Sequence, residues 1–326
     1  MAYPLRFLVR AKGLPAVAGG RLSPMPFILH RSRDNIILHA RLRYTDAADA
    51  DRTPEGHLNR RKFVADSVAT FAAGSSFLPL TFSDAPSTEG VMGSSRTFTL
   101  DAKPTSITLD TAKTAIVVVD MQNDFGTKGG MFDRAGIDIS LIQRAVPPTA
   151  RVLAAGRKAG IKVVYLKMAY KPDLSDMGAP GSPNRRVHEQ IMHVGTTVRA
   201  PNGAESRILV RDTWDSDIVD ELKPESADTV IYKSRFSGFY ETELDNKLKG
   251  LGIRYLIVTG CTTSVCVEST IRDAMFRDYS PVLLEDCTAE PVGYGLPRSN
   301  HEATLLLIQI MLGWVSSSDK FIKALE

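Results

Sequence analysis

The chain is organised around YLIVTGCTTSVCVE, residues Tyr255 to Glu268. An apolar run ends at Gly260, and a short polar segment leads to Cys266, where we expect a helix to begin. A thiol between a buried strand and a helix lies near backbone N–H groups and the positive end of the helix dipole, which lower a thiol pKa. A small cysteine packed in the core fits the same pattern, so the stretch alone leaves both interpretations open.

Outward from this stretch, apolar strands alternate with helical segments. Strands are predicted at 114–120, 161–166, 228–233, 255–259 and 280–285, and helices at 141–158, 241–249, 264–277 and 300–312. In the first helix, Pro147 and Pro148 are expected near the first turn. The alternation predicts an α/β fold, a doubly wound and mainly parallel sheet with helices on both faces. The long connection 167–226 is expected to form an active-site loop or lid.

Composition excludes several classes of protein. The 326 residues carry a net charge of only +3, with no blocks of basic residues, so we expect no nucleic-acid partner. No apolar stretch approaches the ~20 residues of a membrane span, so no membrane association is expected. Three cysteines, an odd number, favour a reduced protein or a reactive thiol over a disulfide framework.

The first hundred residues differ in composition from the rest. We assign 1–103 to an N-terminal extension and 104–326 to the α/β domain. The extension is interpreted as disordered, as a start-site artefact or as a targeting segment. Arg60-Arg61, followed by small and apolar residues, resembles a twin-arginine export signal. We expect a cytoplasmic protein, with export through this signal as the alternative.

Three reactive side chains are expected at one edge of the sheet, where ligands of such folds bind. Asp120 ends one apolar strand, Lys233 ends another, and Cys266 follows a third. Together they suit nucleophilic catalysis: the lysine favours the thiolate, and the aspartate takes the thiol proton and later delivers it to a leaving amine. Taken singly, Asp120 also fits a helix cap or a loop salt bridge, and Lys233 a surface lysine.

No metal or cofactor is expected. His188 and His193 are five residues apart, which does not place them as a facing pair on a helix, and no histidine accompanies the strand-end residues. The segment after the first strand lacks the glycine spacing of a nucleotide-binding loop.

At these residues the chain resembles the isochorismatase-like cysteine hydrolases. The resemblance covers about Ile107 to Leu325 and rests on AIVVVDMQNDF (115–125), on Lys233 and on VTGCTTSVCVEST (258–270). It implies the isochorismatase-like hydrolase fold, with Asp120 as base, Lys233 as supporting cation and Cys266 as nucleophile. It also implies a cis peptide at Cys261-Thr262 that orients the N–H groups of Thr262 and Cys266 as an oxyanion hole.

Within this superfamily the chain resembles most the ureidoacrylate amidohydrolase and biuret hydrolase branch. The supporting segments are GAPGSPN (178–184), DTWDSDIVDELKP (212–224) and KSRFSGFYETELD (233–245). The ureidoacrylate branch usually has Asn, Trp and Tyr where this chain has Met168, Tyr170 and Phe236. The candidate walls of the substrate pocket, each of which also fits plain core packing, are Phe125, Met168, Tyr170, Phe236 and Tyr240.

The resemblance predicts a hydrolase acting on C–N bonds, other than peptide bonds, in linear amides. Its substrate would be a small amide or ureido compound of the ureidoacrylate or biuret type, cleaved through a thioester acyl-enzyme. The alternatives are an isochorismatase-type ether hydrolase and a non-catalytic binding protein on the same fold. A homodimer or homotetramer is expected.

Overall fold

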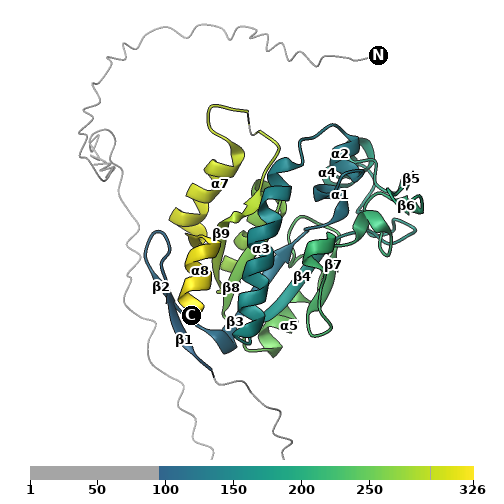
Figure 1. The fold of residues 1–326 in the computed structure, drawn as a ribbon. Coiled ribbons are helices and arrows are strands. Elements are labelled where there is room, and N and C mark those ends of the chain that lie inside the picture. Colours follow the sequence, from purple (N-terminus) through teal and green to yellow (C-terminus); the bar gives the residue numbers. More distant parts are fainter. Residues whose placement is uncertain (1–94, 294) are drawn as a thin grey trace, which may run out of the picture. The chain divides into compact units, whose positions relative to one another are not determined.

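The centre of the fold is a six-stranded parallel sheet. The structure is a computed structural model that describes residues 95–293 and 295–326 (Figure 1). The strand order is β10-β9-β8-β3-β4-β7, and every neighbouring pair is parallel. The strands are β3 (Thr114–Val119), β4 (Lys162–Met168), β7 (Thr229–Lys233), β8 (Tyr255–Cys261), β9 (Ser280–Ala289) and β10 (Trp314–Ser316). The predicted doubly wound α/β fold is confirmed.

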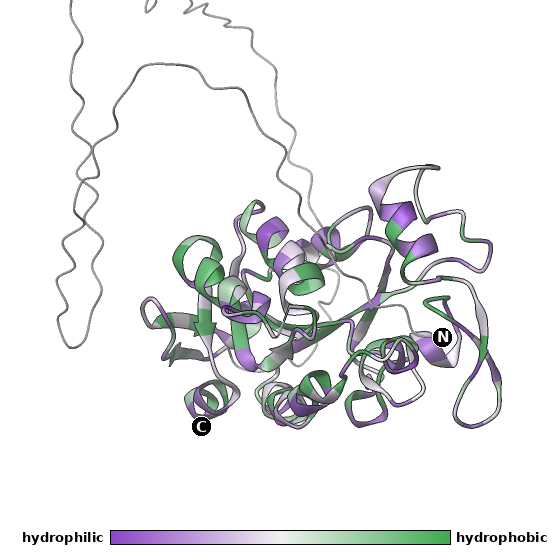
Figure 2. Ribbon diagram, turned by 90° about the horizontal axis from the view of Figure 1, so that it is seen from above, coloured by the Kyte–Doolittle hydropathy of each residue, from purple (hydrophilic) through white to green (hydrophobic). Residues whose placement is uncertain are grey.

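Helices cover both faces of the sheet, as the view from above shows (Figure 2). Helices α3 (Ser140–Lys158) and α8 (Ser318–Leu325) pack on one face, and α5 (Leu244–Gly250) and α6 (Glu268–Met275) pack on the other. Alternate residues of β3 enter the two cores, so every residue of this strand is buried. Burial on both faces explains why the strand is a continuous apolar run in the sequence.

Two adjacent prolines lie inside α3, not at its first turn. The helix begins at Ser140 and continues through Pro147 and Pro148 to Lys158, so the expected position of the prolines was wrong. Each proline removes one intrahelical N–H donor. The carbonyls that lose their donors belong to Gln143 and Arg144, four residues earlier; both residues are exposed, where solvent can satisfy a helix carbonyl.

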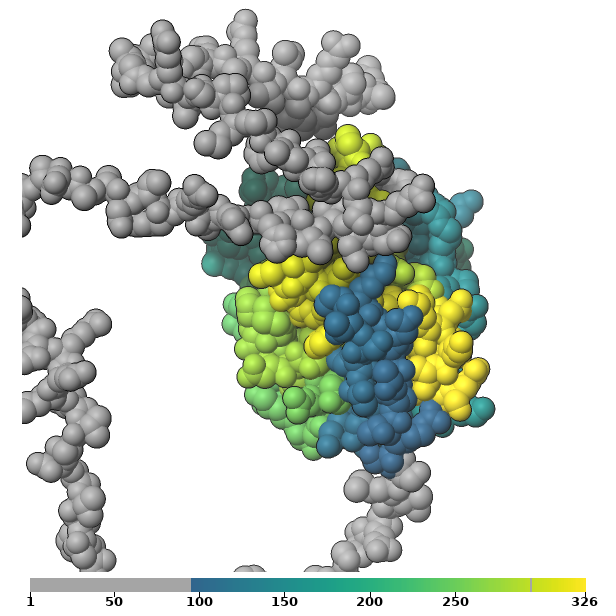
Figure 3. Space-filling view, turned by 90° about the vertical axis from the view of Figure 1, so that its left-hand side faces the viewer, coloured from purple at the N-terminus to yellow at the C-terminus, as the bar shows by residue number. Residues whose placement is uncertain are grey.

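An antiparallel hairpin, β1 (Thr97–Leu100) and β2 (Ile107–Asp110), precedes the sheet. It lies beside the C-terminal segment (Figure 3), and Phe98 of β1 packs edge-to-face on Phe321 of α8. β1 thus lies N-terminal to the boundary predicted at Pro104, while Arg60-Arg61 lies outside the described residues. None of the helices described at 95–293 and 295–326 has the length and apolar character to cross a membrane.

The remaining elements connect the strands, and several of them lie beyond the carboxyl ends of the strands (Figure 1). The long connection between β4 and β7 forms one α-helix, a small hairpin and two 3-10 turns. Its elements are α4 (Pro183–Gln190), β5 (Thr197–Arg199), β6 (Glu205–Arg207), η2 (Trp214–Ser216) and η3 (Asp220–Leu222). The other short elements are η1 (Thr111–Lys113), α1 (Asn123–Gly126), α2 (Met131–Arg134), η4 (Thr263–Val267), α7 (Asn300–Leu307) and η5 (Ile308–Leu312).

Gly260 permits the close approach of β8 to β3. Its φ is 120°, in the region that favours glycine, and a Cβ there would lie 2.0 Å from the Val119 carbonyl oxygen. Val119 and Gly260 are partners in the strand register. The glycine therefore fixes the distance between Asp120, which follows β3, and the cysteine-bearing segment that follows β8.

Candidate active site

Asp120 and Lys233 form a buried ion pair at the carboxyl edge of the sheet. Asp120 follows β3, and Lys233 is the last residue of β7; these two strands flank β4 in the sheet. Lys233 Nζ lies 2.7 Å from Asp120 Oδ2, although the angles fall outside hydrogen-bond geometry. Their side chains are 0% and 1% exposed. Each charge stabilises the other, because burying either one without an opposite charge would cost several kcal/mol of folding free energy.

The backbone aims Asp120 at this position. Its φ is 52°, a left-handed conformation that is uncommon outside glycine and that aspartate adopts more readily than most residues. Next to it, the buried Gln122 side chain accepts from Met168 N (2.7 Å) and donates to the carbonyls of Met168 and Ser216. Gln122 therefore ties the end of β3 to the end of β4, and its role was not predicted from the sequence.

Cys266 lies beside this ion pair. It sits on η4, a π-helical turn between β8 and α6, and its thiol interacts with both the Asp120 carboxylate and the Lys233 ammonium. The structure thus brings the three predicted residues together. The π-helical turn was not expected, since the sequence pattern indicated one regular helix across 264–277.

The protonation of this site follows from its burial. Burial, the largest influence, raises the pKa of the Asp120 carboxyl against the opposing charge of Lys233. Burial lowers the pKa of Lys233, but Asp120 and Cys266 outweigh it, and the net shift is upward. Burial also raises the pKa of the Cys266 thiol despite Lys233. The expectation of a lowered thiol pKa was therefore wrong, and burial favours a neutral resting thiol beside the Asp120–Lys233 pair.

A neutral resting thiol predicts a particular pH dependence. The rate at which iodoacetamide alkylates Cys266 should keep rising as pH increases through about 8.5, the usual thiol pKa, because only the thiolate reacts. The measurement is the modified fraction of the Cys266 peptide by mass spectrometry, with Cys266→Ser as the control that assigns the signal. A rate that levels off below about pH 8 contradicts the raised pKa.

Side chains from β9 and α7 hold the loop between β8 and Cys266 in place. Its Cys261-Thr262 peptide bond is cis. Thr263 Oγ1 lies 3.0 Å from both Thr288 Oγ1 and His301 Nδ1, and Thr288 Oγ1 donates to the Gly260 carbonyl (2.7 Å). These contacts fix the loop that carries the predicted oxyanion-hole donors.

A second anchor comes from Glu290, just beyond β9. Its carboxylate accepts from the backbone N–H and the hydroxyl of Ser264, at 3.0 and 2.6 Å. Neither Thr288 nor Glu290 was predicted, because the strand was expected to end at Glu285 and in fact continues to Ala289. The polar residues after Glu285 were the sequence feature that could have indicated these two loop anchors. Cys287, on the same strand, is fully buried in the core.

Cys266 opens into a cavity of about 180 Å³. Its polar lining residues are His188, Cys261, Thr262 and Cys266. Its apolar walls are Phe125, Met131, Phe132, Ala135, Ile137, Met168, Ile191, Met192, Leu209, Phe236, Val265 and Val292.

Three of the five candidate wall residues, Phe125, Met168 and Phe236, line this cavity. The other two do not. Tyr170 is buried behind it, where its hydroxyl donates to the Ser234 carbonyl (3.2 Å). Tyr240 is 45% exposed, with the Arg235 guanidinium over its ring.

A buried carboxylate holds two walls of the cavity together. Asp124 accepts from Met131 N at 3.0 Å and from Leu209 N at 2.7 Å. Arg134 bridges Asp124 and Asp215. Burial, and then the neighbouring Asp215, raise the pKa of Asp124 well above its usual range. The segments after β3 and before η2 are thus joined through one charged cluster.

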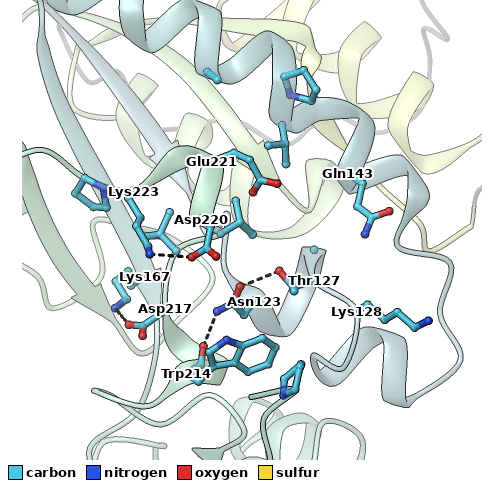
Figure 4. Close-up of a pocket in the computed structure, with 18 of the residues that line it drawn as sticks. Asn123, Thr127, Lys128, Gln143, Lys167, Trp214, Asp217, Asp220, Glu221 and Lys223 are labelled. Carbon is cyan, nitrogen blue, oxygen red and sulfur yellow. Dashed lines mark hydrogen bonds and ion pairs between the residues drawn. The ribbon is translucent and has the colours of Figure 1, made fainter. Parts of the chain in front are cut away.

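A larger surface depression, of about 1220 Å³, lies beside α1, η2 and η3 (Figure 4). Its charged side chains include the pairs Lys167–Asp217 and Lys223–Asp220. It is not lined by any of the three clustered residues, so the candidate chemistry lies in the smaller cavity. Across the described ranges, no group of three or more His, Cys, Asp or Glu residues is arranged to hold a metal ion.

A thiol, a carboxylate and an ammonium at the carboxyl edge of a doubly wound sheet define a class, the isochorismatase-like cysteine hydrolases. The family model described as "Isochorismatase domain" matches residues 114–320, and the chain belongs to this family. It is a hydrolase that acts on C–N bonds in amides.

Two curated relatives are ureidoacrylate amidohydrolases named RutB. The protein from Methylorubrum extorquens is 42% identical over 228 residues, which is 70% of this chain and 89% of the relative. The protein from Serratia proteamaculans is 38% identical over 229 residues, again 70% and 89%. Among solved structures, a cysteine hydrolase from Pseudomonas syringae pv. phaseolicola matches with a TM-score of 0.56 and 28% identity, covering 67% of this chain and 94% of that one.

Proposed function

We propose that this chain is a cysteine-dependent amidohydrolase that cleaves a small linear amide or ureido substrate through a thioester on Cys266. The observation that carries the proposal is the buried cluster of Asp120, Lys233 and Cys266 beside the small cavity. A thiol with a carboxylate partner and a cation in one site has the parts needed for acyl transfer.

The first half of the reaction forms the thioester. Asp120 takes the proton of the Cys266 thiol as the sulfur attacks the carbonyl carbon, and the carbonyl oxygen becomes an oxyanion. The N–H groups of Thr262 and Cys266 stabilise this oxyanion. The C–N bond then breaks, and Asp120 delivers its proton to the leaving nitrogen, which departs as ammonia or an amine.

The second half releases the product. A water molecule gives a proton to Asp120 as its oxygen attacks the thioester carbon, the C–S bond breaks, and the proton returns to sulfur. The net change is amide plus water to acid plus amine. Lys233 transfers no proton in this scheme; its charge stabilises Asp120 in the carboxylate form and the sulfur as it becomes a thiolate.

The ureido group is the finer part of the proposal. It is supported by the names of the relatives, which are 38–42% identical ureidoacrylate amidohydrolases, and by the resemblance to biuret hydrolases. Both substrates carry a terminal ureido group, –NH–CO–NH2, whose carbonyl carbon is the expected point of attack.

The test is ammonia release from a substrate panel: ureidoacrylate, biuret, carbamoyl amino acids and nicotinamide, with pyruvate release from isochorismate measured in parallel. We expect ammonia from at least one ureido compound and no pyruvate. Pyruvate without ammonia would support the ether-hydrolase alternative, and no turnover of any compound would support a binding protein on this fold.

A further inference from the structure

A chain of polar contacts lies behind the loop that leads to Cys266. His301 Nδ1 lies 3.0 Å from Thr263 Oγ1, which in turn lies 3.0 Å from Thr288 Oγ1. Thr288 Oγ1 lies 2.7 Å from the carbonyl oxygen of Gly260. The two threonine side chains are buried, and the imidazole is half-buried. The contacts therefore run from α7 through the loop to β9, and from there back to the end of β8.

The direction of each hydrogen bond follows from the last acceptor in this chain. A carbonyl only accepts, so the single hydroxyl proton of Thr288 goes to Gly260. The contact between the two threonines then requires the hydroxyl proton of Thr263, and none is left for its contact with His301. All three contacts are hydrogen bonds at once only if His301 donates from Nδ1. The neutral tautomer protonated at Nδ1 and the imidazolium both meet this requirement.

The chain holds the two residues that flank the Cys261-Thr262 peptide. Gly260 precedes this peptide and is also the partner of a β9 residue in the strand register, and Thr263 follows the peptide. The N–H groups of Thr262 and Cys266 are the proposed oxyanion-hole donors. Such donors are effective when they are held in place before the negative charge develops. Contacts that fix both flanking residues therefore act on the oxyanion hole without touching the substrate.

Helix α7 gives His301 a fixed position. The helix begins with a capping box, in which Ser299 Oγ accepts from Glu302 N (3.2 Å) and the Glu302 carboxylate accepts from Ser299 N (3.1 Å). One turn after His301, Thr304 Oγ1 donates to the carboxylate of Glu268, the first residue of α6 (2.8 Å). The imidazole is thus positioned relative to both the loop and α6.

We propose that His301 is a positioning residue of the active site, whose Nδ1–H holds the oxyanion-hole loop in place through Thr263 and Thr288. The inference rests on the proposed amidohydrolase function and adds a residue on which its rate depends. His301 is not among the residues that line the cavity of Cys266, so we expect no contact between the imidazole and the substrate. Its loss should lower the rate of the chemical step and leave substrate binding nearly unchanged.

The first test compares two substitutions of His301 that share a shape and carry no charge. His301→Asn keeps an N–H donor near the position of Nδ1, whereas His301→Leu has the same branching and no donor. We expect His301→Leu to lower kcat for ammonia release by about tenfold or more, because misplaced oxyanion donors are costly, and His301→Asn to keep most of the activity. KM should change by less than about threefold in both variants.

A second readout separates the oxyanion hole from the thiol. Iodoacetamide alkylates a thiolate by displacement at a saturated carbon, so no oxyanion forms. We expect the alkylation rate of the Cys266 peptide to be the same in His301→Leu and in the wild type. A general disturbance of the site would lower alkylation and kcat together, and that result overturns the proposal. A wild-type kcat in His301→Leu, or an equal loss of kcat in His301→Asn, overturns it as well.

A second pair of variants interrupts the same chain from β9. Thr288→Val keeps the shape of the side chain but removes its hydroxyl, whereas Thr288→Ser keeps the hydroxyl. Valine leaves the Gly260 carbonyl without its donor, so we expect kcat to fall by about tenfold or more, again with unchanged alkylation of Cys266. Serine should keep most of the activity. If His301→Leu does not fold, this pair decides, and equal kcat values for valine and serine overturn the proposal.

The outcomes separate this inference from the function on which it rests. If the wild type releases ammonia from a ureido compound in a Cys266-dependent manner and the variants of His301 and Thr288 all match it, the positioning role is wrong and the amidohydrolase function stands. If the wild type cleaves no amide or urea of the panel, both fall.

Discussion

Replacing Cys266 with alanine should lower kcat for ammonia release by at least about 10³-fold, because the proposed mechanism places the nucleophile on its sulfur. Cys266→Ser should lose activity to a similar extent, since a hydroxyl beside Asp120 is a far weaker nucleophile than a thiol. Both changes are small and border a cavity, so circular dichroism and the unfolding midpoint should remain close to wild type.

Cys287→Ala is the matched control. Cys287 is also fully buried, but it lies in the core on β9 and does not line the cavity. We expect it to lose some stability and to keep its activity. Full activity in Cys266→Ala would exclude covalent catalysis at this residue.

Replacing Lys233 with methionine should both inactivate and destabilise the enzyme. The change leaves the Asp120 carboxylate buried without its partner 2.7 Å away. Removal of one member of a buried ion pair costs about 3–5 kcal/mol of unfolding free energy, which urea denaturation measures.

The double variant Asp120→Asn/Lys233→Met separates stability from activity. It removes both charges, so we expect most of the lost unfolding free energy to return. Activity should not return, because the proton acceptor for the Cys266 thiol is also gone. A double variant no more stable than Lys233→Met would show that the ion pair is not the source of the destabilisation.

The sequence allowed the candidate site to be predicted because its residues are placed by the ends of the predicted strands. Asp120 follows one strand, Lys233 ends a second, and Cys266 lies in the turn beyond a third, and parallel strands bring their carboxyl ends to one edge of the sheet. The position of a residue relative to its strand was therefore enough to predict that these three meet.

The placement of other side chains around the cavity was not predictable in this way. His188 lies on a helix within a connection of about sixty residues, and its approach to Cys266 depends on how that connection folds over the sheet. Tyr170 and Tyr240 both follow strand ends, yet one packs behind the cavity and the other turns to solvent. Such orientations depend on packing between distant segments, which local patterns do not determine.

The thiol pKa shows a similar limit. A helix start and a nearby lysine both indicate a lowered pKa, but the degree of burial is a tertiary property, and at Cys266 it dominates. The structure thus favours proton transfer to Asp120 during attack over a thiolate formed beforehand.

The most direct measurement is the mass of the enzyme quenched with acid during turnover of a ureido substrate. The thioester mechanism predicts a protein species heavier by the acyl or carbamoyl group, with the added mass on the peptide that contains Cys266 and absent from Cys266→Ala. Attachment of the group to another residue would contradict it.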